Sequence, residues 1–266
     1  MSTTSVAGKV VWITGASSGI GEALCHVLAS RGAVLVLSAR RVDVLEKVRA
    51  ACANLDQHLA LPLDMLAPET FASAYQTILE RFGRVDVLIN CAGISQRGRA
   101  LETNLQVDRH LMDLNYFGPI ALTKLVLPAM VDRGDGQIVV VSSLMGKLAM
   151  PGRGAYAASK HALHGFFDAL RAEVQRNGVF VTIVCPGYIR TNASFNALEG
   201  DGKPFNKWDK DIQRGMAPEK CANKIVRAIE CRRREVNVCG KERLGLFLHR
   251  VAPNLFHRII RSVKRK

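Results

Sequence analysis

Hydrophobic and polar positions divide this chain into two kinds of segment that alternate almost from end to end. Short runs rich in Val, Ile and Leu have the composition of buried strands, and they lie at residues 10–14, 33–38, 59–63, 85–90, 137–142, 179–185 and 236–239. Between them, apolar residues recur at helical spacing at residues 20–31, 43–53, 69–82, 104–131, 155–176 and 218–231. This alternation predicts an α/β doubly wound (Rossmann) fold: one domain with a mostly parallel seven-stranded sheet and helices on both faces.

One long segment, residues 187–217, follows neither pattern. It contains Gly, Pro, Asn and charged residues with little periodicity. A loop of this length inside a compact domain usually has a function, often as a lid. We therefore expect it to border the substrate site.

Composition narrows the class of protein. With 266 residues, 48% of them hydrophobic, the chain can bury the core of one large domain. The start leads directly into the first strand, so we expect no cleaved leader, and no run approaches the roughly 18 apolar residues of a membrane span. The seven cysteines are scattered and contain no C-x-x-C pair. This usage predicts reduced thiols in a cytoplasmic protein and no metal site.

Positive charge is concentrated at the C-terminal end. The net charge is +14, and residues 214–266 carry 15 Lys/Arg against 4 Asp/Glu, which leaves only +3 for residues 1–213. Such asymmetry indicates contact with an anionic lipid or nucleic acid, or a solvated surface. The basic residues have no interleaved aromatics and no recognition motif, so nucleic acid is not favoured.

A glycine-rich turn follows the first predicted strand. Gly15, Gly19 and Gly21 allow a tight strand-to-helix turn and close approach of a pyrophosphate to the helix N-terminus, where free N–H groups favour an anion. The spacing is G-x-x-x-G-x-G and not the commoner G-x-G-x-x-G, but the strand–turn–helix context supports a dinucleotide site. A tight turn that binds nothing is the alternative.

The end of the second strand indicates which dinucleotide. An acidic residue there would bind the ribose 2′-hydroxyl of NAD, but the chain has Ser38-Ala39-Arg40-Arg41 instead. Arg40 is a candidate partner for a 2′-phosphate, and Ser17 a candidate hydrogen-bond donor to it. This favours NADP(H) over NAD(H), unless the arginines only solvate a helix start.

Tyr156 and Lys160 lie four residues apart in a predicted helix, and Ser143 precedes them. Side chains at this spacing project from one helix face. A nearby cation lowers the pKa of a tyrosine from about 10, which would make the phenol a proton donor and acceptor near neutral pH. The alternative is a half-exposed tyrosine and a solvated lysine.

Taken in order, these motifs resemble the classical short-chain dehydrogenase/reductase family. The likeness runs from Lys9 to about Gly240, and its nearest branch contains the 11-beta-hydroxysteroid dehydrogenases and their bacterial relatives. The motifs are Thr14-Gly15-x-x-x-Gly19-x-Gly21, Asn90-Cys91-Ala92-Gly93, Asn115, Ser143, Tyr156-x-x-x-Lys160 and Pro186-Gly187. Cys91 stands where the family usually has a second asparagine, a change that we expect to matter little.

The resemblance implies a role for each catalytic position. Tyr156 is implied as the acid and base that exchanges a proton with the substrate oxygen. Lys160 would bind the nicotinamide ribose and lower the pKa of Tyr156, Ser143 would orient the substrate oxygen, and Asn115 would hold a water in the proton relay. Ser142 would face the other way on its strand.

The resemblance also implies cofactor and substrate contacts. Asp64 would meet the adenine, and the stretch from Pro186 to Thr191 would hold the carboxamide. The implied cofactor residues are Gly15, Ser17, Ser18, Gly19, Ile20, Gly21, Arg40, Asp64, Asn90, Ala92, Gly93, Tyr156, Lys160, Pro186, Gly187, Ile189 and Thr191. The implied substrate residues are Ser143, Met145, Tyr156 and Tyr188.

The function implied is an NADP(H)-dependent oxidoreductase that interconverts a carbonyl and a secondary alcohol on a lipophilic substrate. A 3-oxoacyl-thioester reductase shares every motif, and a nucleotide-binding homologue without chemistry is a further alternative. Residues 1–240 would form the catalytic domain. The family resemblance implies a homodimer or homotetramer built through the helices that carry Asn115 and Tyr156.

Residues 241–266 form a basic, amphipathic tail. Pro253 interrupts any helix there, and Leu255, Phe256, Ile259, Ile260 and Val263 then recur on one predicted helix face. Two interpretations fit this pattern. The helix lies in a membrane interface as a peripheral contact, or it packs on its own subunit or a neighbour.

Overall fold

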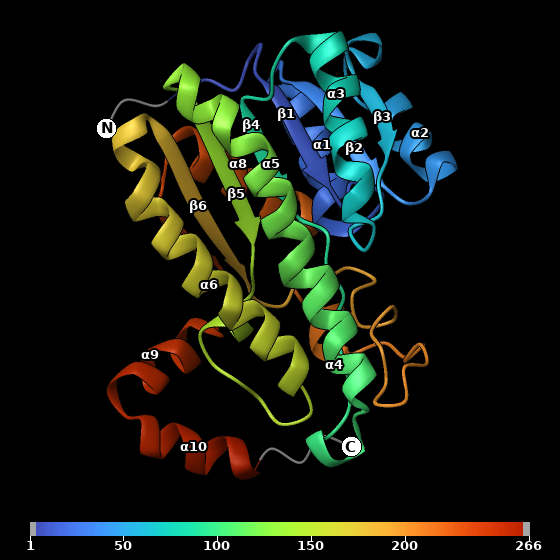
Figure 1. Ribbon diagram of the computed structural model, residues 1–266. Coiled ribbons are helices and arrows are strands. Elements are labelled where there is room, and N and C mark those ends of the chain that lie inside the picture. The colour runs from blue at the N-terminus through green and yellow to red at the C-terminus, as the bar shows by residue number, and fades with distance from the viewer. Residues whose placement is uncertain (1–3, 263–266) are drawn as a thin grey trace.

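A single parallel sheet is the centre of the molecule (Figure 1), and the computed structural model describes residues 4–262 of it. The strands are paired in the order β3-β2-β1-β4-β5-β6-β7, and every neighbouring pair is parallel. They are β1 Val10–Thr14, β2 Val34–Ala39, β3 Leu59–Pro62, β4 Val87–Asn90, β5 Gly136–Val141, β6 Val179–Pro186 and β7 Glu235–Val238. This confirms the predicted Rossmann-like α/β fold in one domain.

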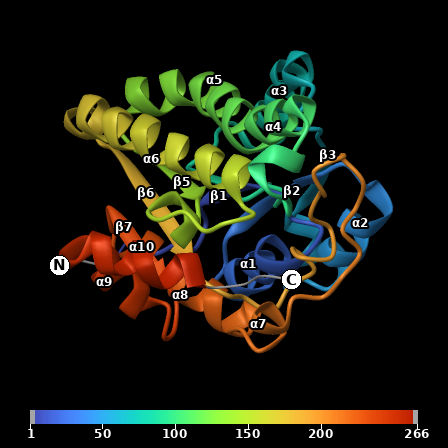
Figure 2. The ribbon, with the colours of Figure 1, turned by 90° about the horizontal axis from the view of Figure 1, so that it is seen from below.

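Helices cover both faces of the sheet (Figure 2), as its continuously apolar strands require. One face carries α1 Gly19–Ser30, α2 Val42–Ala50 and α8 Pro218–Glu230; the other carries α3 Phe71–Phe82, α4 Leu105–Met112, α5 Gly118–Arg133 and α6 Gly154–Val174. Side chains alternate along each strand, so Val11 and Ile13 pack in the core with α1 and α8. Trp12 packs in the other core, under α3, α5 and α6.

The predicted helix at residues 104–131 is three consecutive segments. A π-helical turn, Asp113–Phe117, joins α4 to α5. The stretch Leu105–Arg133 contains an 18-residue window with a mean hydropathy of 1.3, so by length and composition alone it could cross a membrane, whereas we expected no such segment. Here it covers the sheet, and 44% of its most apolar window is buried in the fold.

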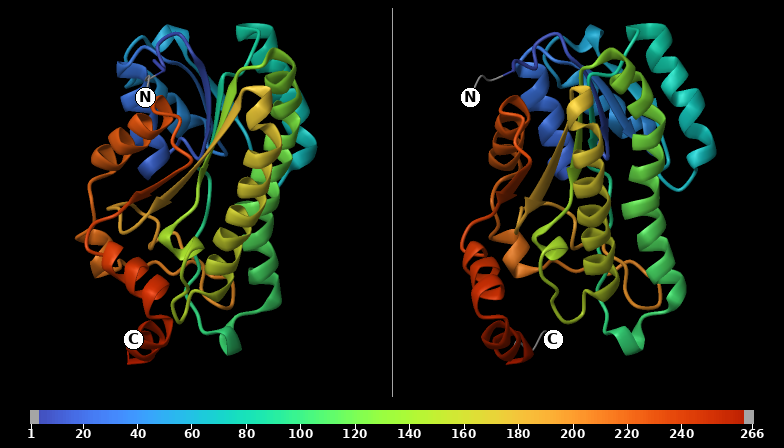
Figure 3. Two further views of the ribbon diagram at one scale, coloured as in Figure 1. Left: turned by 90° about the vertical axis from the view of Figure 1, so that its left-hand side faces the viewer. Right: turned by 60° about the vertical axis from the view of Figure 1, so that its left-hand side comes forward.

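Two helices follow β7. They are α9 Arg243–Val251, which periodicity did not predict, and α10 Pro253–Ser262, and they are broken beside Pro253 as expected. Both views in Figure 3 place them past the carboxyl end of the sheet, beside the segment that joins β5 to α6. Of the predicted apolar face of this tail, Val263 lies outside the described residues.

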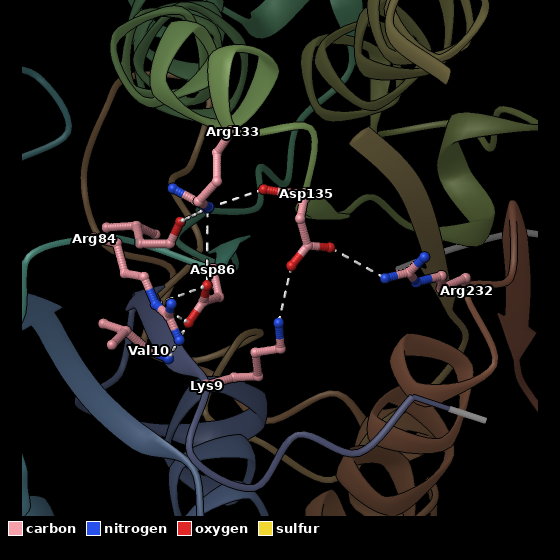
Figure 4. A network of polar contacts seen from close by, with 8 residues as sticks. Lys9, Val10, Arg84, Asp86, Arg133, Asp135 and Arg232 are labelled. Carbon is pink, nitrogen blue, oxygen red and sulfur yellow. Dashed lines mark hydrogen bonds and ion pairs between the residues drawn. The ribbon is translucent and has the colours of Figure 1, made fainter. Parts of the chain in front are cut away.

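A polar network ties the strands together at their amino ends (Figure 4). The buried carboxylate of Asp86 accepts a hydrogen bond from the Val10 amide at 2.8 Å. Asp135 pairs with Lys9 at 2.9 Å and with Arg232 at 3.2 Å. These contacts lie at the edge opposite the glycine-rich turn, so they brace the sheet and leave its carboxyl edge to the candidate site.

Candidate active site

The predicted site residues follow the carboxyl ends of neighbouring parallel strands. The glycine-rich turn follows β1, residues 91–93 follow β4, Ser143 follows β5 and Gly187 follows β6. Parallel strands end at the same edge of a sheet, so these segments meet there.

The three glycines of the turn are packed too closely for a side chain at their positions. Gly15 and Gly19 have φ angles of +69° and +60°, in the left-handed region that favours glycine. A Cβ added at Gly15 would lie 2.8 Å from the Ala92 backbone, and one at Gly19 would lie 3.1 Å from the Thr191 side chain. A Cβ at Gly21 would lie 2.1 Å from the Gly15 carbonyl oxygen. The fold thus brings three of the predicted cofactor segments into contact.

Thr14 holds the turn against the end of β4. Its Oγ1 accepts hydrogen bonds from the backbone amides of Cys91 at 3.1 Å and Ala92 at 3.2 Å. We had assigned no role to this threonine. Burial raises the pKa of the Cys91 thiol to about 12, so the cysteine is a neutral wall residue.

Ser143 and Tyr156 lie together near the start of α6. Ser143 caps a short 3₁₀ turn, where its Oγ accepts a hydrogen bond from the Met145 amide at 3.1 Å. Burial raises the pKa of the Tyr156 phenol, and this outweighs the opposing effects of its hydrogen bond with Ser143 and the charge of Arg97. Ser142, as predicted, faces the other way and bonds to the Lys160 carbonyl at 3.2 Å.

Lys160 is buried beside Tyr156 but does not donate to it. Its Nζ donates to the Val141 carbonyl at 2.9 Å and lies 5.9 Å from the centre of the tyrosine ring. Burial lowers the pKa of Lys160 to about 8. In the protein alone the pKa of Tyr156 lies above its ordinary value, because desolvation of the phenol has the largest effect. That Lys160, with the positive ring of an oxidised nicotinamide, lowers this pKa stays a prediction.

Asn115 lies in the π-helical turn, and its side chain hydrogen-bonds to other groups of the protein. Nδ2 donates to the Ile94 carbonyl at 2.9 Å and to Ser159 Oγ at 3.0 Å, while Oδ1 accepts from the Ile94 amide at 2.9 Å. A Cβ added at Gly93 would lie 3.2 Å from Asn115 Oδ1 and 3.3 Å from Lys160 Nζ. The absence of a side chain at Gly93 therefore lets its backbone lie close to both polar groups.

Three other predicted cofactor residues do not share in these contacts. Asn90 is buried and donates to Thr123 Oγ1 of α5 at 3.0 Å, so its side chain faces away from the turn. Asp64 accepts a hydrogen bond from the Leu66 amide at 3.0 Å and caps its own turn. Arg40 is exposed at the end of β2.

The loop at residues 187–217 is fastened to the body by a cluster of charges. Asp209, just before the short helix α7 Lys210–Gln213, pairs with Arg97 at 2.7 Å and with Arg153 at 3.6 Å. All three side chains are largely buried. Sequence reasoning missed this cluster, since isolated charges in loops carry no periodic signal.

Glu242 ties the start of α9 to the start of the same loop. Its carboxylate accepts hydrogen bonds from the amides of Tyr188 at 2.9 Å and Gly240 at 2.8 Å. A Cβ added at Gly187 would lie 2.7 Å from Glu242 Oε1, so the glycine permits this approach. Nothing in the sequence pattern distinguished this glutamate from other surface acids.

We expect Glu242→Gln to loosen the loop at residues 187–217. In glutamine one of the two carboxylate oxygens becomes an NH₂ group, so one backbone N–H loses its acceptor and the other keeps only a neutral one. The loss of charge-assisted hydrogen bonds costs about 1–3 kcal/mol. Limited proteolysis should cut the loop several-fold faster than in the parent. Glu219→Gln, at an exposed position of α8, is the matched control and should leave the rate unchanged. Equal cleavage rates for all three proteins would refute the fastening role.

Comparison with known proteins adds relatives over nearly the whole chain. The family described as short chain dehydrogenase matches residues 9–201. The dehydrogenase/reductase SDR family member 7B of Bos taurus is 42% identical over 269 residues, which cover 98% of this chain and 83% of that protein. The dehydrogenase/reductase SDR family protein 7-like of Drosophila melanogaster is 43% identical over 265 residues, covering 97% and 82%.

Solved structures share the fold. A short-chain dehydrogenase from Streptomyces avermitilis superposes with a TM-score of 0.82 at 33% identity, covering 98% of this chain and 100% of that one. Two further structures resemble the fold at lower identity. They are a Burkholderia phymatum enzyme in complex with NAD (TM-score 0.82, 23% identity, 94% and 96% covered) and a Burkholderia cenocepacia one in complex with NADP (0.80, 24%, 98% and 100%).

Proposed function

This chain belongs to the short-chain dehydrogenase family, and we propose that it is an NADP(H)-dependent enzyme that interconverts a carbonyl and a secondary alcohol on a lipophilic substrate. The family makes it an oxidoreductase with a nicotinamide cofactor. One observation supports the finer proposal above all: Ser143, Tyr156 and Lys160 lie together at the carboxyl edge of the sheet. They lie beside a turn whose glycines leave no room for a side chain.

The residues present fit a dinucleotide. Gly15, Gly19 and Gly21 allow the tight turn at the start of α1, where N–H groups and the helix dipole attract phosphate. Lys160 Nζ, which lies close to Gly93, would donate a hydrogen bond to a hydroxyl of the ribose. When bound, the nicotinamide supplies or accepts the hydride.

Tyr156 is the proposed proton donor and acceptor in this mechanism. Burial keeps the phenol protonated near neutral pH, so it is ready to donate to a carbonyl oxygen during reduction. Ser143 Oγ, which bonds to the phenol, would orient that oxygen through a second hydrogen bond. In alcohol oxidation the same phenol must first lose its proton, and the charge of Arg97 favours that form.

The preference for NADP(H) rests on the end of β2. Arg40 is exposed there, and in the described part of the chain neither Arg40 nor Arg41 pairs with a carboxylate. An arginine that has no acidic partner can bind a 2′-phosphate with two hydrogen bonds. No acid lies in this stretch to accept from a 2′-hydroxyl.

We expect Arg40→Asp to reverse the cofactor preference. A carboxylate at this position repels the 2′-phosphate and accepts from the 2′-hydroxyl, so the ratio of NADPH to NADH affinity should fall about a hundredfold or more. Titration of both cofactors by fluorescence measures the ratio directly. Arg176→Asp makes the same charge change at an exposed position after α6 and should leave the ratio unchanged. Equal affinity of the parent for NADPH and NADH would already contradict the assignment.

The substrate pocket is proposed to be apolar. Met145 and Tyr188 are half-buried at its predicted border, and the loop at 187–217 contributes Phe195 and Trp208, whose rings lie 5.6 Å apart. A 3-oxoacyl-thioester reductase remains the second candidate. Oxidation of NADPH with lipophilic ketones, compared with a 3-oxoacyl thioester, separates the two. Tight NADPH binding without turnover of either would favour a non-catalytic homologue.

We propose that the protein assembles as a homodimer or homotetramer through the helices that carry Asn115 and Tyr156. All seven cysteines are free thiols, which supports a reducing compartment such as the cytoplasm.

A further inference from the structure

Each of the two C-terminal helices exposes an apolar face, and we call the two faces together the apolar stripe. Of the eleven large apolar side chains that residues 4–262 expose, five lie in α9 and α10, three or four residues apart. They are Leu244 (70% exposed), Phe247 (64%), Val251 (57%), Leu255 (49%) and Ile259 (47%). An apolar stripe of this kind ordinarily faces a core, so its exposure requires a partner.

The helices are nevertheless fixed to each other and to the body. Phe256 is buried between them, its ring 5.0 Å from that of His249. Leu246 packs against the core under α6. The part of α9 that faces inward is thus occupied, which limits the interpretation that the tail only packs on its own subunit. The exposed side chains of the stripe point away from this inward face.

The charge around the stripe favours an anionic partner. Residues 243–266 contain seven Lys/Arg and no Asp/Glu, although the last three of these cations lie outside the described residues. A second copy related by a twofold axis would bring the same cations face to face, which opposes self-association through this surface. A surface of anionic lipid headgroups complements both features, because it accepts cations beside an apolar layer.

The position of the stripe relates it to the candidate site. α9 starts at Glu242, whose carboxylate holds the amide of Tyr188 at the start of the 187–217 loop. Figures 1 and 3 place α9 and α10 beyond the carboxyl edge of the sheet, beside the segment that leads to Tyr156. A flat partner that contacts the stripe would therefore lie near the mouth of the site.

We propose that α9 and α10 form a docking surface for an anionic membrane. The apolar stripe enters the boundary between headgroups and acyl chains, and the arginines contact the anionic headgroups. The docking itself is independent of catalysis. If the proposed function also holds, docking brings the site to a bilayer in which a lipophilic carbonyl compound dissolves.

Sedimentation with vesicles tests the docking. The full chain is mixed with vesicles of phosphatidylcholine alone or with about one third phosphatidylserine, at low and high salt and without substrate. We expect binding to the anionic vesicles that weakens at high salt, since screening reduces attraction between exposed charges. Combined Phe247→Ser, Leu255→Ser and Ile259→Ser should lower the affinity about tenfold or more. Combined Val42→Ser and Leu55→Ser, which removes exposed apolar groups on and just after α2, far from the tail, should not.

Charge reversal provides an independent variant should the serine variant fold poorly. Arg250→Glu with Arg261→Glu keeps the stripe and should abolish the difference between anionic and neutral vesicles. No binding at low salt, or equal binding to both vesicles, would overturn the proposal. A parent that is larger than the serine variant by light scattering, without lipid, would identify the stripe as a contact between copies and also overturn it. Turnover in vesicle-free solution reports separately on the proposed function.

Discussion

Replacement of Tyr156 by Phe is expected to lower kcat about 10²- to 10⁴-fold, the usual contribution of a positioned proton donor. The change removes only the hydroxyl, which bonds to Ser143 and would serve the substrate oxygen. The ring, and the buried Lys160 beside it, stay in place. Affinity for NADPH should therefore change less than about threefold, a small effect beside the loss of rate.

The measurement pairs steady-state turnover with cofactor titration. Tyr75→Phe is the matched control, since burial also raises the pKa of this half-buried tyrosine, which stacks on Trp12 under α3. It should keep nearly full activity. A Tyr156→Phe enzyme with more than a few per cent of the parent kcat would remove Tyr156 from the proton transfer.

Replacement of Lys160 by Met is expected to damage both cofactor binding and rate, by about tenfold or more each. The ammonium group donates to the Val141 carbonyl and lies close to Gly93, so methionine fills the volume but leaves the buried carbonyl without its donor. Because the pKa of Lys160 is about 8, the charged form predominates below that pH and is lost above it. The parent's affinity for NADPH should fall as pH rises through 8.

The pH profile distinguishes a ribose-binding role from a purely structural one. In Lys160→Met, the affinity should be low and should not change near pH 8. A variant that is merely less stable would keep the parent's profile over its folded fraction. Unchanged NADPH affinity in a folded Lys160→Met protein would show that the ribose assignment is wrong.

The fold followed from sequence because each strand is a continuous apolar run bounded by turn residues. The bounds of β1 match those predicted, whereas β4 starts two residues late, at Val87. The reason is Asp86, whose carboxylate takes the Val10 amide at the place where the strand pattern would continue. The π-helical turn around Asn115 was not predicted, since the apolar spacing continues through it.

The site was predictable only as far as local motifs reach. The pairing of Arg97 with Asp209 spans 112 residues and that of Tyr188 with Glu242 spans 54, and neither contact leaves a pattern in the sequence. The raised pKa of Tyr156 was missed for a related reason. Spacing places Lys160 near the phenol, but the burial that raises the pKa of Tyr156 depends on the assembled fold.

The network in Figure 4 has a consequence for the order of events during folding. Asp135 pairs with Lys9, 126 residues earlier, and with Arg232, 97 residues later. During synthesis, Lys9 therefore meets its partner only once the middle of the chain has been made, and Asp135 meets Arg232 only once the segment before β7 has been made. Contacts of such long range slow folding, because the entropy of closing the loops is lost before the contacts form. A growing chain that has not reached Arg232 cannot complete this network, so the sheet is expected to gain its full stability only after Arg232 has been made.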